Sequence, residues 1–287
     1  MWRNLHRQFA VGYIPELQEA IINYFENAPD SEVRKIQRDR LDKIIKNLCN
    51  LLKRAYPIKE RHRIIEHFSL SISTIMFKSN YLQVRIDGLK ILNFIIKDVE
   101  KSLSHTITAN DLAEWLKKQE ILEEVLGPKK HPQILQRSNY LISFLYDQHL
   151  LDEKALEKMW LLTSDESFQQ EVFKVLQEIS FAPDSSEFAF FAQKISEMNP
   201  LALNEKALNV ICEGRKMAEK LPELLLKYAD ILAKIAFEDN YPIAISEKAL
   251  NKYITMLTDL PFDPFKCDVL KKCICEMLEK VLVPIKI

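Results

Sequence analysis

The cysteines are the side chains of this sequence best suited to nucleophilic or metal chemistry. Five occur, and three of them, Cys267, Cys273 and Cys275, lie in one C-terminal segment. A zinc site needs thiolates or imidazoles that converge on one tetrahedral centre. No histidine lies near that segment, and on a helix Cys273 and Cys275 would point to different sides. We therefore predict ordinary half-buried thiols and no metal site.

Other catalytic signatures are also missing from the sequence. It contains no glycine-flanked nucleophilic serine, glycine-rich phosphate loop, His-Glu-x-x-His or Cys-x-x-Cys motif. The carboxylate pairs Glu123/Glu124 and Glu153/Glu157 could be drawn as acid and base, but on amphipathic helices such pairs are usually solvated surface. We predict a chain that is not itself an enzyme, with no catalytic residue, no cofactor and no small-molecule substrate.

The composition favours helices as the elements that position these side chains. Glycine accounts for only 4 of 287 residues, against a usual share of about 7%. Folds that need many left-handed turns or glycine phosphate loops are therefore disfavoured, which argues against β-sandwiches and most α/β enzymes. With 47% hydrophobic and 28% charged residues, the chain has a globular balance. The prediction is an all-α protein.

Helical periodicity is clearest in the segment 80–103. Apolar residues recur there at steps of three and four from Leu82 to Leu103, and Gly88 lies on a second apolar face. A helix covered on two sides belongs inside an array of helices. Gly88 costs about 1 kcal/mol relative to alanine, so either the cost is tolerated or a neighbouring helix approaches closely. Trp115 and Trp160 also fall on apolar stripes, which predicts packing in the core.

Prolines and a short repeat indicate how the helices are organised. Ten prolines, among them Pro15, fall near predicted helix boundaries and separate roughly a dozen helices. Asp-Glu-Lys-Ala-Leu at 152–156 reappears as Asn-Glu-Lys-Ala-Leu at 204–208 and as Ser-Glu-Lys-Ala-Leu at 246–250. Each copy starts with a good N-cap side chain followed by a first-turn glutamate. Coincidence among helix starts is the plain explanation, but the spacing suits degenerate helix-pair repeats.

We therefore predict an α-solenoid of stacked antiparallel helix pairs of the armadillo or HEAT type. The prediction for domain organisation is a single domain over 1–287, with a soft joint near 127–132 as the alternative.

The charge is balanced overall but uneven along the chain. The formal net charge of -1 argues against a general nucleic-acid binder. Residues 1–63 carry 13 basic and 8 acidic side chains, a balance of +5, so the rest of the chain carries -6. The densest cationic run consists of Lys53, Arg54, Lys59, Arg61 and Arg63. We favour a solvated helix end for this run; the sharper hypothesis is a docking patch for an acidic protein partner.

The termini and cysteines bear on the compartment. The first twenty residues contain charged side chains and no apolar core of a secretory signal, which predicts reduced thiols in the cytoplasm, with the nucleus as a second compartment. The longest stretch without a charged side chain is 67–77, whereas a membrane helix needs about 20 apolar residues. No membrane partner is expected.

The segment 80–257, about three-fifths of the chain, resembles the N-terminal helical region of the large ubiquitin-specific proteases of the fat-facets type. Order and spacing carry the resemblance, and no single motif is diagnostic. The matching segments include Gln-Val-Arg-Ile-Asp-Gly-Leu-Lys-Ile-Leu at 83–92, Ile-Thr-Ala-Asn-Asp-Leu-Ala-Glu-Trp-Leu at 107–116, His-Pro-Gln-Ile-Leu-Gln-Arg at 131–137, Leu-Ile-Ser-Phe-Leu at 141–145, and the stretches 150–160 and 229–254.

This resemblance implies a parent protein that is a cysteine-type deubiquitinase. The cysteine and histidine boxes of that family are absent here, so the resemblance carries over no catalytic residue. It implies a non-catalytic armadillo-like scaffold that holds substrates, regulators or the catalytic domain. The alternative is an unrelated HEAT or armadillo adaptor, such as a nuclear-transport or phosphatase scaffold.

Overall fold

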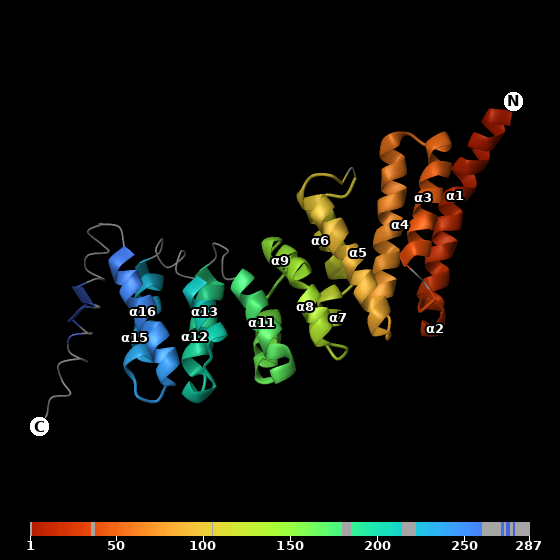
Figure 1. Ribbon diagram of the computed structural model, residues 1–287. Helices are drawn as coiled ribbons and strands as arrows, with labels where there is room; N and C mark the ends of the chain where they lie inside the picture. Colours follow the sequence, from red (N-terminus) through yellow and green to blue (C-terminus); the bar gives the residue numbers. More distant parts are fainter. Residues whose placement is uncertain are drawn as a thin grey trace, which may run out of the picture. The chain divides into compact units, whose positions relative to one another are not determined.

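The computed structural model describes residues 2–35, 38–104, 106–179, 185–213 and 222–259, and five residues between 271 and 278. Within these residues the chain forms fifteen α-helices and two short 3-10 helices, with no strand (Figure 1). The predicted all-α class is confirmed.

Backbone contacts divide the chain into two units, 1–171 and 172–287. The first holds α1 (Trp2–Asn27), α2 (Asp30–Val33), α3 (Arg38–Ala55), α4 (Ile58–Lys78), α5 (Leu82–Glu100), α6 (Ala109–Lys118), α7 (Ile121–Leu126), α8 (Pro132–Arg137), α9 (Asn139–Asp147), α10 (Glu153–Leu161), η1 (Leu162–Ser164) and the start of α11 (Glu166–Ile179). The second holds the rest of α11, then α12 (Ser185–Glu197), η2 (Pro200–Ala202), α13 (Glu205–Glu213), α15 (Pro222–Phe237) and α16 (Ile243–Asp259). The single domain over 1–287 and the soft joint near 127–132 stay predictions.

The first unit begins with three long helices, α1, α3 and α4, which lie side by side (Figure 1). Their shared core contains Ile14, Leu52 and Ile64. The expectation that Pro15 lies near a helix boundary is wrong, because Pro15 lies inside α1. Ile14 and Gln18 are buried on either side of it, and the Gln18 amide donates to the Ile64 carbonyl at 3.1 Å. Packing against α4 therefore holds α1 together across the proline.

Helices α4 and α5 form a closely packed pair joined by the short turn 79–81, and short connections favour antiparallel neighbours. Gly88 of α5 faces the backbone of α4. A Cβ atom added there would lie 2.6 Å from the Phe77 nitrogen and 2.7 Å from the Ser73 oxygen. Of the two interpretations of Gly88, the close approach of a neighbouring helix is confirmed.

Several helices end without glycine. Ser102 and His149, just after α5 and α9, have left-handed φ values of 55°. The next amide in each case bonds back five residues, from Leu103 to the Asp98 carbonyl at 2.7 Å and from Leu150 to the Leu145 carbonyl at 2.9 Å. Leu103 therefore lies beyond the helix and is 58% exposed, so its predicted place on the apolar stripe is wrong.

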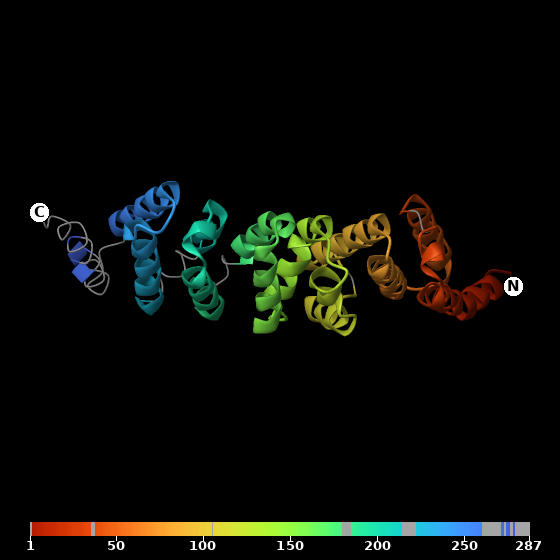
Figure 2. The same cartoon turned by 90° about the horizontal axis from the view of Figure 1, so that it is seen from below.

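The second unit contains the pairs α12–α13 and α15–α16, and both views show α15 and α16 side by side (Figures 1 and 2). Of the repeated helix starts, Asp152 and Asn204 are N-caps, accepting from the amides of Ala155 and Ala207 at 2.9 and 3.0 Å. Ser246 is not an N-cap, because α16 begins three residues earlier, directly after Pro242. All three alanines of the repeat are buried, so the copies share their inward face.

Candidate protein-interaction groove

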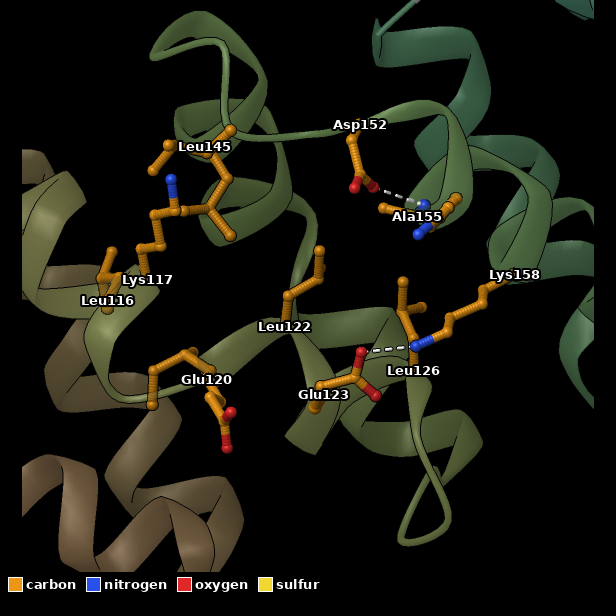
Figure 3. Close-up of a pocket in the computed structure, with 13 residues that line it drawn as sticks. Leu116, Lys117, Glu120, Leu122, Glu123, Leu126, Leu145, Asp152, Ala155 and Lys158 are labelled. Carbon is orange, nitrogen blue, oxygen red and sulfur yellow. Dashed lines mark hydrogen bonds and ion pairs between the residues drawn. The ribbon is translucent and has the colours of Figure 1, made fainter.

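An apolar groove opens on the first unit between α6, α7 and the segment from α9 to α10 (Figure 3). It encloses about 330 Å³. Its apolar lining consists of Leu116, Ile121, Leu122, Leu126, Leu145, Leu150 and Ala155. Its charged rim consists of Lys117, Glu120, Glu123, Asp152, Lys154 and Lys158. An aliphatic cleft with a few polar groups at its edge is the usual form of a binding site.

The α6 side of the groove is fixed by a capping box. Thr108 Oγ1 accepts from the Asp111 amide at 3.2 Å, and the Asp111 carboxylate accepts from the Thr108 amide at 3.0 Å. Hydrogen bonds from the Thr108 side chain and amide lower the pKa of Asp111. After α6, Glu120 adopts a left-handed φ of 53° and turns the chain directly into α7.

The opposite side is fixed by the N-cap of α10. Asp152 Oδ1 accepts from the Ala155 amide, which anchors the first turn of α10 beside the groove (Figure 3). Lys158 on α10 forms an ion pair with Glu123 on α7, so that the two walls are joined across the groove. The side chains of this pair are 46% and 55% exposed, and such pairs contribute about 0–1 kcal/mol.

The remaining rim charges differ in their availability. Within the part of the chain that the structure describes, Lys117 and Lys154 have no ion-pair or hydrogen-bond partner for their amines, and both are exposed. Figure 3 shows the Lys117 amine directed toward Leu145, while the Glu120 carboxylate points away from Lys117. Among the described residues the groove therefore presents two free ammonium groups and one free carboxylate, that of Glu120, at its edge.

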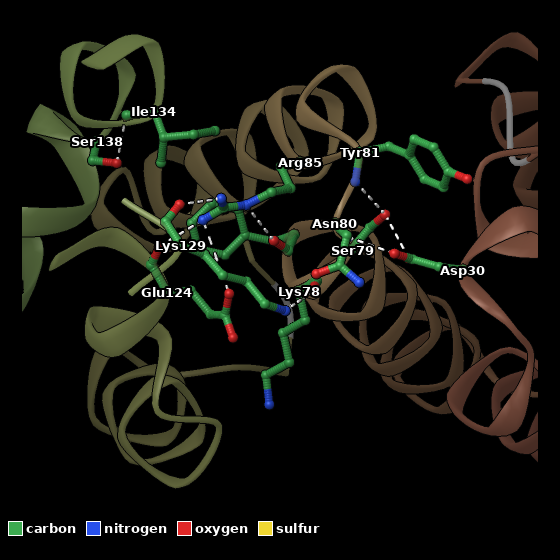
Figure 4. A network of polar contacts seen from close by, with 11 residues as sticks. Asp30, Lys78, Ser79, Asn80, Tyr81, Arg85, Glu124, Lys129, Ile134 and Ser138 are labelled. Carbon is green, nitrogen blue, oxygen red and sulfur yellow. Dashed lines mark hydrogen bonds and ion pairs between the residues drawn. The ribbon is translucent and has the colours of Figure 1, made fainter. Parts of the chain in front are cut away.

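Behind the groove, Arg85 of α5 fixes the position of α7 (Figure 4). Its Nε donates to the Phe77 carbonyl at 3.2 Å, and its terminal nitrogens donate to the carbonyls of Glu124, at 2.6 Å, and Lys129. The Arg85 side chain is only 5% exposed. Burial lowers the pKa of Arg85, and the nearby Glu124 charge opposes that effect. One buried guanidinium thus ties α4, α5, α7 and the turn after α7 together.

A second polar joint lies at the turn between α4 and α5 (Figure 4). The Asp30 carboxylate accepts from the Ser79 hydroxyl and from the Asn80 amide, both at 2.8 Å. Burial acts to raise the pKa of Asp30, but the hydrogen bonds from Ser79 and Asn80 outweigh it, so the pKa is lowered. Lys129 closes the other side by donating to the Lys78 carbonyl at 3.0 Å.

Comparison with known proteins identifies the family to which this helical chain belongs. A family model described as the UBP24/USP9X/USP9Y ARM repeat matches residues 63–286, which include the groove and the Arg85 network. The chain belongs to this ARM repeat family. The resemblance seen in the segment 80–257 is confirmed and extends further in both directions.

The relatives of this ARM repeat chain are ubiquitin carboxyl-terminal hydrolases. It is 25% identical to mouse ubiquitin carboxyl-terminal hydrolase 9X over 85% of the chain. It is 26% identical to human ubiquitin carboxyl-terminal hydrolase 24 over 79% of the chain, and 21% identical to the Drosophila melanogaster probable hydrolase FAF over 92%. The chain spans about a tenth of the length of these relatives, 10%, 9% and 10% respectively. No solved structure matches.

The predicted cationic patch lies at one end of the first unit, apart from the groove. Lys53 lies near the C-terminal end of α3, and Lys59 lies at the start of α4. Both lysines are exposed. Arg63 is exposed and pairs with Glu60 at 2.5 Å, while Arg61 is partly buried. The side chain of Arg54 is outside the described residues. The structure thus gives two exposed lysines and one neutralised arginine, and the docking role stays a prediction.

The cysteines and the tryptophan raised by the sequence take ordinary positions where the structure describes them. Cys212 is partly buried, whereas Cys275 is exposed, so the half-buried position predicted for Cys275 is wrong. The side chain of Cys49, and Cys267 and Cys273 as a whole, are outside the described residues. In the described part of the chain no group of three or more metal-ligating side chains gathers. Trp115 is only partly buried, so its predicted place in the core is wrong; it packs edge-on against His67 and donates to Thr74 at 3.4 Å.

The two paired glutamates of α7 correct the expectation of solvated surface. Glu123 is exposed and pairs with Lys158. Glu124 is only 20% exposed, and its carboxylate lies 3.9 Å from Arg85. The expectation is therefore wrong for Glu124, because the short helix α7 turns its next residue inward toward α5. As to membranes, no described helix is long and apolar enough to cross one.

Sequence reasoning missed the groove itself. Its lining comes from two stretches, 116–126 and 145–158, and only packing brings them together. The nearest signal was the repeated pentapeptide at 152–156, which contains two rim residues, Asp152 and Lys154. That signal predicted a helix start but not a cleft beside it.

Proposed function

We propose that this ARM repeat chain is a non-catalytic interaction segment of a ubiquitin-specific protease, and that it holds substrates, regulators or the catalytic domain of the same protein. The single observation that carries the proposal is the aliphatic groove with free lysines at its rim. Stacked-helix segments bind partners over extended helical surfaces, and the family match supports a link to the ubiquitin pathway. The proposed compartment is the cytoplasm, with the nucleus in addition.

The cationic patch at Lys53 and Lys59 is a second contact surface in this proposal. The carboxylates of an acidic partner would pair with these exposed amines, and such pairs act mainly on the association rate. The proposed partners are proteins. Nucleic acid, membrane and small molecules are not among them.

Quantitative affinity capture tests the proposal. The full chain is immobilised and the proteins retained from a cell extract are identified by mass spectrometry. Ubiquitin-pathway proteins, including fragments of large ubiquitin hydrolases, are the expected enrichment. Retention of nuclear-transport or phosphatase subunits without ubiquitin-pathway proteins would contradict the proposal and support the unrelated adaptor.

A hydrolysis assay tests the non-catalytic half of the proposal. The chain is incubated with a fluorogenic ubiquitin conjugate, alongside the variants Cys212→Ser and Cys275→Ser. We expect no turnover above the blank for any of the three proteins. Turnover by the parent chain that either serine variant abolishes would overturn this half.

A further inference from the structure

We propose that the turn edge of the second unit binds a basic segment of a partner protein, with two exposed aliphatic side chains as the apolar contact. The turn edge consists of the segments 197–206 and 238–248, which join α12 to α13 and α15 to α16. The inference rests on the proposed function, because it names one surface of the interaction segment and the chemistry of the partner that fits it.

The two turns lie side by side at one edge of the unit. Helix α12 packs against α15 and α13 packs against α16, and Figure 1 shows both turns at the lower edge of this unit. On one side, Lys234 Nζ donates to the Ser196 carbonyl at 3.4 Å. On the other side, Lys248 forms an ion pair with Glu205. The two turns are therefore joined on both sides into one continuous surface.

The two turns carry copies of one nine-residue sequence. Pro-Leu-Ala-Leu-Asn-Glu-Lys-Ala-Leu at 200–208 corresponds to Pro-Ile-Ala-Ile-Ser-Glu-Lys-Ala-Leu at 242–250. The fourth residue of each copy is buried, whereas the second residue, Leu201 or Ile243, is exposed. The burial pattern repeats with the sequence, so both copies present an aliphatic side chain outward from equivalent positions.

These two side chains form the apolar part of the surface. Leu201 is 77% exposed and Ile243 is 78% exposed, more than any other large apolar side chain that the structure describes. Single exposed apolar residues are common, but two on adjacent turns can be covered together by one partner. Burial of apolar surface drives most protein association, so the two aliphatic side chains are the core of the proposed interface and the charges around them are its rim.

The charge of the turn edge selects a basic partner. The edge carries five carboxylates and two ammonium groups, a balance of -3: Glu197, Glu205, Glu238, Asp239 and Glu247 against Lys206 and Lys248. Extending the count by one helical turn into α12 and α15 adds Lys194 and Lys234 and leaves a balance of -1. The balance is negative on either count, so a basic segment is attracted and an acidic one is repelled.

The carboxylates that have no partner of their own point to the same sign. In the part of the chain that the structure describes, Glu238, Asp239 and Glu247 are exposed and have no ion-pair or hydrogen-bond partner. Of the two ammonium groups of the edge, one is paired with Glu205, and the other, that of Lys206, is free among the described residues. Three free carboxylates thus outnumber one free ammonium group.

Selection from a displayed library of random peptides tests the inference with no sequence assumed beforehand. The target is the full chain, and each recovered peptide is then measured on the double variant Leu201→Ser with Ile243→Ser. We expect a group of peptides rich in Lys and Arg, with aliphatic residues, whose affinity falls by roughly tenfold or more in the double variant. The inference is wrong if no peptide loses affinity there, or if those that do are acidic or neutral.

A matched variant controls for the loss of an apolar side chain. Both serine substitutions alter side chains that are more than three-quarters exposed, so the fold should be kept. Ile254→Ser is the control, because Ile254 lies on the same helix as Ile243, about three turns further along, and is 43% exposed. It should leave the affinity of the basic peptides unchanged. An equal loss in this control would contradict the site.

A charge reversal tests the rim. The affinity of a recovered basic peptide should fall by roughly fivefold or more in Asp239→Lys, because a like charge then meets the peptide. Asp230→Lys makes the same change at an exposed residue of α15 outside the turn edge, and it should have little effect. Binding to the parent chain should also weaken as salt is raised, since exposed charges are screened. Equal affinities of the two lysine variants would contradict the role of the rim.

Sedimentation of the chain alone tests whether a second copy covers the turn edge instead. We expect parent chain and double variant to sediment alike at every concentration. Concentration-dependent assembly that the double variant abolishes would assign the edge to self-association and would overturn the basic partner.

The outcomes separate this inference from the proposed function. If no peptide uses the turn edge, and affinity capture retains ubiquitin-pathway proteins equally with parent chain and double variant, the inference fails while the proposed function stands. If basic peptides use the edge but capture retains no ubiquitin-pathway protein, the link to the ubiquitin pathway fails while the surface stands.

Discussion

Two adjacent carboxylates on α7 enter different surroundings. Glu124 faces inward, where its side chain is 20% exposed and Arg85 beside it is 5% exposed. Glu123 faces the groove, where it and Lys158 are 55% and 46% exposed. The residue type and the helix are the same, but the access of water and the partner cation differ. Removing one partner from a buried charged contact leaves a desolvated charge behind, whereas an exposed pair is replaced by hydration.

This contrast separates a structural side of the first unit from a binding side. On the structural side, Arg85 and Gly88 hold α4, α5 and α7 in one arrangement. On the binding side, the groove has free lysines whose replacement should leave the fold intact. The following variants are ordered by the size of their expected effect on stability, and each tests whether the two sides differ as described.

Removal of Arg85 should have the largest effect. Arg85→Met leaves the carbonyls of Phe77, Glu124 and Lys129 without their donor, and it leaves Glu124 without its neighbouring cation. The free energy of unfolding should fall by about 3–5 kcal/mol, measured by urea denaturation with circular dichroism. Arg85→Lys should recover only part of this loss, because an ammonium cannot serve three carbonyls in a fork.

Arg137→Met is the control for Arg85. Arg137 is exposed on α8, and its substitution should change stability by no more than about 0.5 kcal/mol. If the two arginine variants lose equal stability, burial does not distinguish the two sides of the unit.

Gly88→Ala should have the second largest effect. Its Cβ would lie under 3 Å from two backbone atoms of α4, and these atoms can move only if the helix moves. We expect a loss of about 1–3 kcal/mol, although alanine favours a helix by about 1 kcal/mol elsewhere. Thermal unfolding measures the loss, and Phe94→Ala, at a residue of α5 that is 64% exposed, is the control. A more stable Gly88→Ala variant would refute the close approach.

Removal of the ion pair across the groove, between Glu123 and Lys158, should have a small effect on the free energy of unfolding. A double-mutant cycle with Glu123→Ala and Lys158→Ala should give a coupling free energy of about 0–1 kcal/mol, smaller still at high salt because exposed charges are screened. Chemical denaturation at low and high salt gives both values. A coupling above about 2 kcal/mol that resists salt would place this pair with Arg85 instead.

Much of the fold could be predicted from the sequence, and the groove could not. The scarcity of glycine and the periodicity over 80–103 predicted helices, because both act within one element. The second apolar face of the segment also suggested that a neighbouring helix approaches closely at Gly88. In contrast, Leu122 and Leu150 border one groove only because α6, α7 and α10 pack in a particular way. The inward turn of Glu124 likewise depends on Arg85, 39 residues earlier in the chain, and no local pattern carries that information.

The smallest effect is expected from removing a hydroxyl that donates to a carboxylate. Asp30 and Asp111 both have a lowered pKa, and they should respond differently to this change. At Asp111 the hydrogen bonds from Thr108 are the main cause of the lowered pKa, and burial has only a minor effect. At Asp30 burial has a large effect that raises the pKa, and the hydrogen bonds lower the pKa against it. Removing one hydroxyl should therefore return the pKa of Asp111 toward its ordinary value of 3.8 in Thr108→Ala. The same removal in Ser79→Ala should raise the pKa of Asp30 further, because burial, the largest influence on Asp30, is then opposed only by the hydrogen bonds from Asn80 and the charge of Lys129.

Carboxyl chemical shifts followed through an acid titration measure both pKa values. Because each folded-state pKa lies below the ordinary value, the stabilisation from these carboxylates is present above pH 3.8. It is lost as the pH falls through the folded-state pKa. Each hydroxyl-deleted variant should therefore differ most from the parent chain near neutral pH and converge with it in acid. If Asp30 and Asp111 respond equally to loss of a hydroxyl, burial does not set the joint at Asp30 apart from the exposed cap of α6.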